Sequence, residues 1–473
     1  MSNPFSYRST ERPAVGPYGQ ASVPASSGWL PGSPCAGYPG MGGSVSSGGY
    51  SSSGMYGMYS SSPTTAWSPE AGWSPEAGWS PEAGWSPEAG LDPSYQSVQQ
   101  SPFPGNWQSN AAVDGDLAKI QQKLRNGEPL RAVHVGPCFC RGGAEQSFID
   151  LAKNLDPRLI RIEASLVTNP HMIDKAVTAD SPVPVIPANA DTVRRAADHA
   201  DIVLFWGVPM GELLQDHRPK LCVYVAHGDN DWTRDVLHDS SPFVDHVIAV
   251  SRRVQENVCR GFASTVILNG VDASRLSQTR SRTDMRRSLG FESDDFVLGF
   301  LGRMSWEKRP ERLIDAVEQL PSNFKALFVG WGPLRPQLLE AANARIPGRY
   351  AFASADRNLG DYYQALDAFC LLSEQEGFAL VLLEAMLTER PIITTDVGFV
   401  SELVEDRINA VVVDGSPQSI RDAALRLQQY PAWANGLAAE GRALADQHGH
   451  AWRMARDYEQ FFWRLWSEKF AAI

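Results

Sequence analysis

The chain has 473 residues and a formal net charge of −12 at pH 7. This length predicts roughly two or three domains, and the acidic balance argues against nucleic acid as the main partner, because phosphate neutralisation needs a basic surface. The N-terminus lacks an apolar signal segment, and no window approaches about 18 consecutive apolar residues. We therefore expect neither a signal peptide nor a transmembrane helix, and we predict a cytoplasmic location.

Residues 1–116 predict a disordered, low-complexity arm. They are dense in Ser, Gly, Pro and Tyr, and the hexapeptide WSPEAG occurs four times in succession from Trp67 to Gly90. The recurring proline denies a helix its backbone hydrogen bonds, and such a segment cannot bury enough apolar surface to offset its ordering entropy. A solvated arm is the simpler interpretation, and a tail whose tryptophans bind an unknown partner is the alternative.

From about residue 117 the chain alternates between short apolar runs and longer helical patterns. This alternation predicts parallel sheets with both faces covered, and it starts again after a polar hinge near residue 281. We expect two Rossmann-like, doubly wound α/β domains, 117–280 and 281–449. An aromatic-rich amphipathic helix at about 450–473 has no following strand and should pack across a domain face. Ligands of open α/β sheets bind beyond the carboxyl ends of the strands, so we look for chemistry in a cleft between two facing domains.

The first candidate site follows the first expected strand, in FCRGGAEQS (139–147). Gly142 and Gly143 would let the backbone approach a ligand just before a helix N-terminus; an ordinary flexible turn is the alternative. The motif is not GxGxxG, so a dinucleotide site is not supported. Cys138-Phe139-Cys140 is a CxC rather than the CxxC of zinc or redox sites, and it predicts two reduced thiols in a loop.

The second candidate is YVAHGDNDW (224–232), where His227 ends an expected strand. This histidine could hydrogen-bond a sugar hydroxyl or polarise an acceptor, and a purely structural histidine is the alternative. Asp229-Asn230-Asp231 has the DxD form of metal-dependent sugar transferases. We interpret it as a helix N-cap region.

The third candidate is FLGRMSWEKRP (300–310). A strand ends at Gly302, and Arg303 and Lys308 lie in or beside the turn that leads to the next helix. Two cations at this end of a strand can neutralise a diphosphate leaving group. The alternative is a pair of ordinary surface cations.

The fourth candidate is a pair of glutamates, Glu376 and Glu384, that flank a stretch without other charges. Glu376 follows a buried strand, and the backbone N–H groups of Phe378, Ala379 and Leu380 should point out of a helix N-terminus, with Gly377 freeing the turn. Glu384 lies about two turns further on, roughly 12 Å away. Carboxylates accept paired hydrogen bonds from diols, so two such acids with an anion site between them describe a nucleotide sugar. A solvated glutamate and an incidental second one are the alternative.

With these residues placed, the body from about Arg131 onward resembles the retaining "group 1" glycosyltransferases of family four, which have the GT-B fold. The resemblance is strongest from Phe296 to Asp414 and depends on the E-x7-E element EGFALVLLE, the GGAE turn and the NGVD segment at 269–272. It implies a GT-B arrangement, two Rossmann-like domains facing across a cleft, with the last helix crossing back onto the first domain.

The resemblance also implies roles. Arg303 and Lys308 would bind the donor diphosphate, Glu376 would contact hydroxyls of the donor sugar with the amides of 377–380 nearby, and Glu384 would bind the ribose diol. Gly143 would approach the phosphates, and His227 would contact the donor sugar near the reaction centre. The implied reaction is front-face transfer with retention, in which the departing phosphate oxygen helps to deprotonate the acceptor, and no metal or other cofactor is required.

Three departures from the family pattern stand out. Arg309 replaces the usual glycine after the phosphate-binding lysine, TERP (388–391) replaces a commoner small-Gly-Pro turn, and DRINAVVV (406–413) lacks the usual glycine before its strand. None of them removes a proposed ligand, and Arg309 leaves the geometry of its loop open.

The leading hypothesis is a metal-independent, hexosyltransferase-type enzyme that uses a UDP- or GDP-sugar donor. The acceptor could be a polysaccharide, a lipid, a protein or a small molecule. A nucleotide-sugar epimerase of the same fold is one alternative, and a non-catalytic scaffold that recruits partners through the arm is another. A weak peripheral membrane contact stays open, although no strongly basic amphipathic helix supports it.

Overall fold

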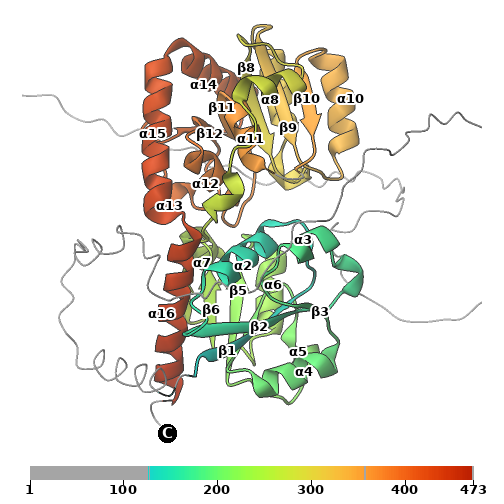
Figure 1. Ribbon diagram of the computed structural model, residues 1–473, viewed down its shortest axis with the longest axis vertical. Helices are drawn as coiled ribbons and strands as arrows, with labels where there is room; N and C mark the ends of the chain where they lie inside the picture. Colours follow the sequence, from blue (N-terminus) through green and yellow to red (C-terminus); the bar gives the residue numbers. More distant parts are fainter. Residues whose placement is uncertain (1–125, 127, 356–357, 471–473) are drawn as a thin grey trace, which may run out of the picture. The chain divides into compact units, whose positions relative to one another are not determined.

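The computed structural model describes residues 126, 128–355 and 358–470. These residues build two parallel sheets, each with its own set of helices (Figure 1). The arm predicted for residues 1–116 lies outside the described residues. Within the described part of the chain, no helix combines the length and the apolar character needed to cross a bilayer.

The first sheet has seven strands in the order β3-β2-β1-β4-β5-β6-β7, and every pairing is parallel. Its strands are β1 (Leu130–Gly136), β2 (Ile160–Val167), β3 (Val185–Pro187), β4 (Ile202–Phe205), β5 (Leu221–Ala226), β6 (His246–Ala249) and β7 (Ser264–Val266). Its helical segments are α2 (Gly143–Asn154), η2 (Pro170–Met172), α3 (Lys175–Ala179), α4 (Ala190–His199), α5 (Met210–Leu214), α6 (Asp231–Asp239) and α7 (Arg252–Val258). The short segment η3 (Ala273–Leu276) follows in the connection to the second sheet.

The second sheet has six strands in the order β10-β9-β8-β11-β12-β13, again all parallel. Its strands are β8 (Phe296–Leu301), β9 (Phe324–Val329), β10 (Tyr350–Ala353), β11 (Ala368–Leu371), β12 (Ile392–Thr394) and β13 (Val411–Val412). Its helical segments are α8 (Arg282–Ser288), η4 (Trp306–Lys308), α9 (Glu311–Glu318), α10 (Arg335–Arg345), α11 (Leu359–Ala365), α12 (Leu380–Leu387), α13 (Val400–Leu403), α14 (Pro417–Gln429) and α15 (Pro431–His448). The prediction of two Rossmann-like α/β domains is confirmed.

The central strands explain why the sequence shows continuous apolar runs instead of alternation. Every residue of β4 and of β5 is buried, because helices cover both faces of a parallel sheet. Each fully buried aliphatic side chain, such as Leu204 or Val223, contributes about 1.5–3 kcal/mol relative to exposure. These strands therefore form rigid supports for the loops that follow them.

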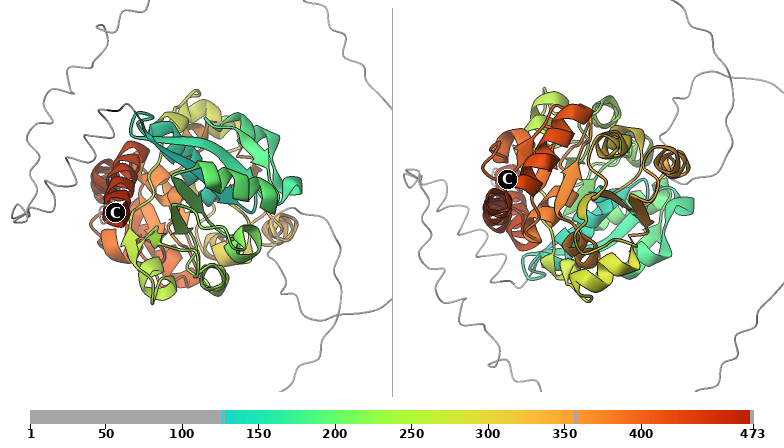
Figure 2. Two further views of the ribbon diagram at one scale, coloured as in Figure 1. Left: turned by 90° about the horizontal axis from the view of Figure 1, so that it is seen from below. Right: turned by 90° about the horizontal axis from the view of Figure 1, so that it is seen from above.

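The last helix, α16 (Ala451–Phe470), packs against α2 of the first domain. In Figure 2 it is the dark red helix seen end-on. The Phe461 ring lies 5.0 Å from the His246 ring on β6, and Glu459 accepts a hydrogen bond of 2.7 Å from the backbone N–H of Asp156. Lys469 pairs with Asp245 at 2.6 Å. The chain therefore returns to the first sheet after it has completed the second.

The strand orders locate the point in each sheet where a ligand site is expected. The direction of chain progression reverses between β1 and β4 in the first sheet and between β8 and β11 in the second. Open α/β sheets bind ligands at the carboxyl ends of the strands that flank such a reversal. The loops after β1, β8 and β11 carry Gly142 and Gly143, Arg303 and Lys308, and Glu376, respectively.

The three departures from the family pattern share a backbone feature. Arg309, Glu389 and Arg407 have φ angles of 49°, 54° and 63°, in the left-handed region that favours glycine. A non-glycine residue there costs about 1–2 kcal/mol of strain. The chain tolerates this strain where the family pattern has glycine or a glycine-containing turn.

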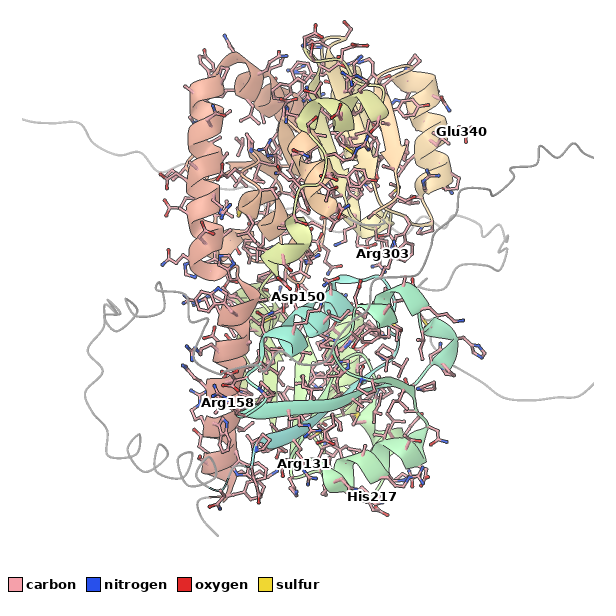
Figure 3. All side chains as sticks on the ribbon, in the orientation of Figure 1. Arg131, Asp150, Arg158, His217, Arg303 and Glu340 are labelled. Carbon is pink, nitrogen blue, oxygen red and sulfur yellow. The ribbon has the colours of Figure 1, made fainter. Side chains whose placement is uncertain are left out.

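We expect Glu389→Gly to raise the free energy of unfolding by about 0.5–1 kcal/mol, since relief of strain outweighs the greater entropy of the unfolded chain. The Glu389 side chain is 63% exposed and its ion pair with Arg442 spans 3.9 Å, so little is lost. The matched control is Glu340→Gly on the exposed face of α10 (Figure 3), which should lower stability by about 1 kcal/mol. Urea unfolding measures the free energy of unfolding of both variants. An equal decrease in the two variants would contradict the strain argument.

Candidate functional site

The loops after β8 and β11 lie against each other. The backbone N–H of Glu374 donates to the carbonyl of Glu307 at 2.8 Å, and Arg309 Nη1 donates to the Glu374 carboxylate at 2.6 Å. Lys308 Nζ donates to Glu376 Oε2. These contacts bring together four charged side chains that follow two different strands, and the ion pair of Arg309 adds to the backbone bond that joins the loops.

Glu376 is 7% exposed, and both of its carboxylate oxygens have partners. Oε1 accepts a hydrogen bond of 2.7 Å from Ser373 Oγ, and Oε2 accepts one from Lys308 Nζ. An ionised carboxylate offers about four lone-pair sites, so acceptor capacity remains after these two bonds. The Lys308 side chain is 23% exposed, which leaves the ammonium with donors for a further partner.

Arg303 is the more accessible cation, with 42% of its side chain exposed (Figure 3). Its Nη2 donates to Glu307 Oε1 at 2.9 Å, and Ser305 Oγ donates to the same oxygen at 2.5 Å. Burial raises the pKa of Glu307, but the hydrogen bond from Ser305 and the Arg303 charge outweigh it and lower the pKa overall. The Glu307 carboxylate therefore stays ionised and holds Arg303 at the end of β8.

Gly302 makes the turn into this loop. Its φ is 146°, and its N–H donates to Val329 O at 2.9 Å. Gly330, at the end of the neighbouring strand, approaches it so closely that a Cβ there would lie 2.1 Å from Gly302 O. This contact excludes a side chain at Gly330, and the positive φ angle disfavours one at Gly302, so the loop of Arg303 begins directly at the edge of the sheet.

Helix α12 begins later than the sequence suggests. We expected the amides of residues 378–380 at the helix N-terminus, but the helix starts at Leu380, with Ala379 as its N-cap at φ 78° and ψ 69°. No side chain caps this end. Phe378 is 4% exposed and its ring packs at a tilt against Phe399, with the ring centres 4.7 Å apart, so the ring belongs to the core. The uncapped amides that can receive an anion are therefore those that begin at Leu380.

Glu384 belongs to a separate ion-pair network. It is 3% exposed, and its oxygens accept hydrogen bonds from Arg275 Nη2 at 2.6 Å and from Tyr363 Oη at 2.7 Å. Arg275 Nε lies 3.4 Å from the carboxylate of Asp150 on α2, which Figure 3 labels. Among the described contacts, Glu376 and Glu384 share no partner. The arginine therefore joins an acid of α2 to an acid of α12.

The two glycines after β1 have different surroundings. Gly142 has an extended backbone, and a Cβ on it would lie 2.4 Å from Glu145 Oε2. Gly142 thus makes room for a carboxylate of its own chain. Gly143 begins α2, and the nearest atom to a Cβ on it would be Leu380 Cδ1 at 3.9 Å. Gly143 therefore lies beside the start of α12.

His227 follows β5, and its backbone lies against the loop of Glu376. A Cβ on Gly377 would lie 1.9 Å from His227 O, and Ser251 Oγ donates to Gly377 O at 2.8 Å. The His227 ring packs edge-on against Trp206 at 5.7 Å, and burial lowers the pKa of His227 to about 4. This imidazole is therefore neutral near pH 7 and can accept or donate a hydrogen bond without adding charge.

Other partners of the site were not singled out from the sequence. Ser373, three residues before Glu376, and Ser305, two residues before Glu307, are local in sequence, and their spacing could have been noticed. Tyr363 and Arg275 reach Glu384 across long sequence separations, for which one sequence has no signal. Asn230 caps α6 by accepting a hydrogen bond from Thr233 N, as predicted for the DxD segment.

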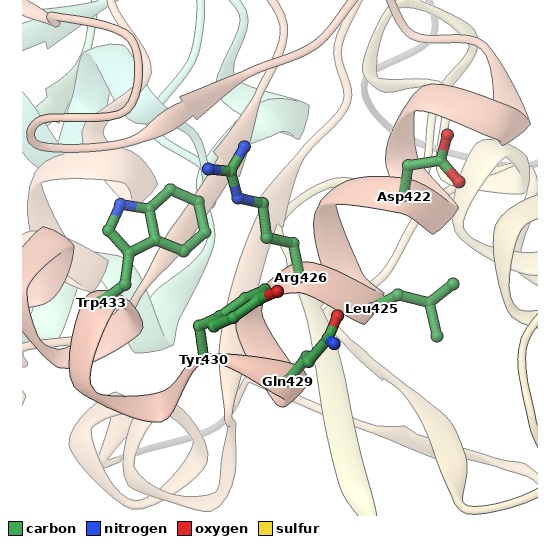
Figure 4. Close-up of a pocket in the computed structure, with 6 residues that line it drawn as sticks. All are labelled: Asp422, Leu425, Arg426, Gln429, Tyr430 and Trp433. Atoms are coloured by element: carbon green, nitrogen blue, oxygen red, sulfur yellow. The ribbon is translucent and has the colours of Figure 1, made fainter.

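A surface cavity of about 520 Å³ lies elsewhere in the second domain, where α14 meets α15 (Figure 4). Asp422, Leu425, Arg426, Gln429, Tyr430 and Trp433 line it. The Arg426 guanidinium lies over the Trp433 ring at 4.6 Å. None of the predicted site residues lines this cavity, which is therefore separate from the candidate site.

Residues 281–435 match the family model described as glycosyl transferases group 1. TuaC of Bacillus subtilis is 32% identical over 195 residues, 41% of this chain and 49% of that protein. The lipopolysaccharide core biosynthesis mannosyltransferase LpsB of Rhizobium meliloti is 32% identical over 219 residues, 43% of this chain and 62% of that protein. The chain thus matches roughly half to three-fifths of the length of these relatives.

Solved structures extend the likeness to both domains. HepE of Anabaena, in complex with UDP and glucose, superposes with a TM-score of 0.61 at 22% identity, over 70% of this chain and 99% of that chain. Sucrose-phosphate synthase of Thermosynechococcus elongatus gives 0.59 at 18% identity, over 72% and 100%. At these identities the likeness establishes the fold. Residues 281–435 therefore match the group 1 glycosyl transferases, and the described part of the chain has the GT-B fold of two Rossmann-like domains.

Proposed function

We propose that the chain is a glycosyltransferase that moves a sugar from a nucleotide diphosphate-sugar to an acceptor hydroxyl with retention of anomeric configuration. The observation that carries this proposal is the cluster of Arg303, Lys308 and Glu376 at the carboxyl ends of β8 and β11, inside the segment that matches the family model. The structures of HepE are complexes with UDP and glucose and with UDP-glucose, which supports a UDP-sugar among the UDP- and GDP-sugars considered.

The cations would act on the leaving group. As the bond between the sugar and the diphosphate breaks, negative charge grows on the departing phosphate oxygen, and fixed cations stabilise this charge more in the transition state than in the ground state. Lys308 has unused ammonium donors, and Arg303 has an accessible guanidinium that Glu307 holds in place. The reaction that we propose uses these side chains without a metal.

Glu376 would orient the donor sugar. Its remaining lone pairs can accept hydrogen bonds from sugar hydroxyls, while Ser373 and Lys308 hold the carboxylate in one position. His227 would add a neutral hydrogen-bonding group near the reaction centre, and the departing phosphate oxygen would assist deprotonation of the acceptor on the same face. In the same assignment, the backbone of the turn at Gly142 and Gly143 would approach the phosphates of the donor.

Glu384 would bind the ribose diol with the lone pairs that Arg275 and Tyr363 leave available. Because the carboxylate is 3% exposed, a diol reaches it only if these side chains share it or move aside. The uncapped amides at the start of α12 would lie between this ribose contact and the sugar contact of Glu376. The proposal leaves the acceptor open among polysaccharides, lipids, proteins and small molecules.

A thermal-shift screen of the full chain against UDP, GDP and ADP and their sugars tests donor binding. A true donor should raise the free energy of unfolding by about 2.7 kcal/mol at a concentration of 100 times its Kd. Arg303→Ala should abolish the shift, whereas Arg158→Ala, which removes an arginine with an 86% exposed side chain in the first domain, should retain it.

Nuclear magnetic resonance of the incubated donor then distinguishes the reactions. Transfer or slow hydrolysis that releases the nucleoside diphosphate supports the proposal. Conversion of the sugar without any acceptor would replace it with an epimerase. Binding without hydrolysis, and without turnover on any acceptor class tested, would replace it with a scaffold function.

A further inference from the structure

Three side chains with metal-ligating atoms meet just after β1. Cys138 Sγ lies 3.5 Å from Cys140 Sγ and 2.8 Å from Glu145 Oε1, and Cys140 Sγ lies 3.6 Å from the same carboxylate oxygen. Cys138 is 8% exposed and Glu145 4%, while Cys140 is half-buried. Their ligand atoms all lie within 4.8 Å of one another, and no other group of three such side chains is found this close together among the described residues.

The backbone holds these groups on one side. Phe139 forms a parallel bridge with Ile173, in which its N–H donates to Met172 O at 2.8 Å and its carbonyl accepts from Asp174 N at 2.9 Å. Residues on either side of an extended residue point in the same direction, so both thiols face the same space. The Phe139 ring is fully buried and packs edge-on against Phe148 of α2, which fixes the loop to the helix that carries Glu145.

We propose that Cys138, Cys140 and Glu145 bind one zinc-type divalent cation. In a tetrahedral zinc site, with Zn–S near 2.3 Å and Zn–O near 2.0 Å, two sulfurs lie about 3.8 Å apart and a sulfur and an oxygen about 3.5 Å apart. The separations of 3.5 Å and 3.6 Å already match this geometry. The Cys138–Glu145 pair, now at hydrogen-bonding distance, needs to open by about 0.7 Å.

The surroundings fit a cation with thiolate ligands. The absent side chain of Gly142 leaves room for the Glu145 carboxylate, because a Cβ there would lie 2.4 Å from Oε2. Two thiolates and one carboxylate give a divalent site a net charge of about −1, which the N-terminus of the twelve-residue helix α2 stabilises. Cys140 is half-buried, so a water oxygen can complete four-fold coordination.

A redox pair is the competing interpretation, and the third group of the cluster favours a cation. A disulfide needs only the two sulfurs, whereas here one carboxylate oxygen lies within 3.6 Å of both Sγ atoms. The thiolate and the carboxylate are the ligating forms, so binding of a cation would release their protons. The cation would fix the turn of Gly142 and Gly143, and it has no part in the transfer chemistry proposed above.

Metal analysis of the full chain, purified without chelators, tests the site. We expect about one zinc per wild-type chain and less than about 0.1 zinc per chain in Cys140→Ser. Loss of a residue that only hydrogen-bonds to a ligand can lower metal affinity about 100-fold, and loss of a ligand itself should lower it at least as much. Cys259→Ser, which removes a buried thiol of the first domain at the end of α7, is the matched control and should retain the metal. The half-buried Cys140 is the first choice because its replacement disturbs the core least.

Titration of the metal-free chain with Co²⁺ gives a second, spectroscopic readout. Its main outcomes come from the wild-type chain and so do not depend on whether a variant folds. The wild-type chain should develop a thiolate-to-cobalt charge-transfer band, and added Zn²⁺ should remove the band and protect two thiols from a thiol reagent. Glu145→Gln should weaken the cobalt complex while the charge-transfer band remains. The inference is overturned if the wild-type chain shows no such band, if the band is undiminished in Cys140→Ser, or if Cys138 and Cys140 are isolated as a disulfide.

Discussion

Replacement of Glu376 by glutamine should lower kcat/KM for sugar transfer at least about 100-fold, in the range caused by losing one preorganised group of an active site. Glutamine keeps the shape and can still accept from Ser373, but it has no charge to hold Lys308 and one fewer acceptor oxygen for sugar hydroxyls. Because Lys308 is 23% exposed, water can solvate the ammonium that loses its partner. The melting temperature should therefore change by no more than a few degrees.

The neighbouring glutamate supplies the control. Glu374→Gln changes the same residue type two positions earlier, in an ion pair with Arg309 whose glutamate side chain is 52% exposed. Exposed pairs of this kind contribute about 0–1 kcal/mol, so both stability and transfer should stay near wild type. Steady-state kinetics and thermal unfolding of the two variants decide the matter. Equal activity in Glu376→Gln and the wild-type chain would reject the assignment of the site.

Gly377→Ala should destabilise the chain by about 1–3 kcal/mol or more, the cost of forcing an extra carbon into a packed interior. The added Cβ would lie 1.9 Å from His227 O and 2.8 Å from its carbonyl carbon, and backbone atoms cannot rotate away as a side chain can. The loop of Glu376 must then move from the end of β5, and its hydrogen bond from Ser251 weakens. Transfer activity should fall together with stability.

Gly436→Ala is the opposite case. Gly436 lies inside α15, and a Cβ on it would meet no atom within 4 Å, so alanine should stabilise the chain by about 0.5–1 kcal/mol through its higher helix propensity. Denaturant unfolding of both variants compares one substitution in two surroundings. A Gly377→Ala variant as stable and active as Gly436→Ala would show that the loop does not pack against β5 in solution.

The fold was predictable because its signals are local. Continuous apolar runs such as 202–205 and 221–226 predict strands buried on both faces, and the repeated alternation with helices predicts two parallel sheets. Both predictions are confirmed. The start of α12 was placed too early because its N-cap, Ala379, adopts a left-handed conformation that alanine rarely takes, so the sequence carries no sign of it.

The site was predictable only in its positions along the chain. The sequence predicts Arg303, Lys308 and Glu376 because each follows an expected strand, and the contact between Lys308 and Glu376 follows from the adjacency of β8 and β11. The network of Glu384 depends instead on Arg275, 109 residues away. The thiols of Cys138 and Cys140 were noticed, but their third partner, Glu145, lies across a turn on the following helix.

The contact between α16 and α2 bears on how the protein is made. A ribosome releases β1 to β7 long before it reaches residues 451–470, so α2 lacks a helix that it packs against in the folded chain until the whole second sheet has been translated. Domains that fold in order during synthesis normally avoid such a delay. Here the sheet that is translated first is also the last to gain all of its helices, and a product of interrupted translation would lack α16.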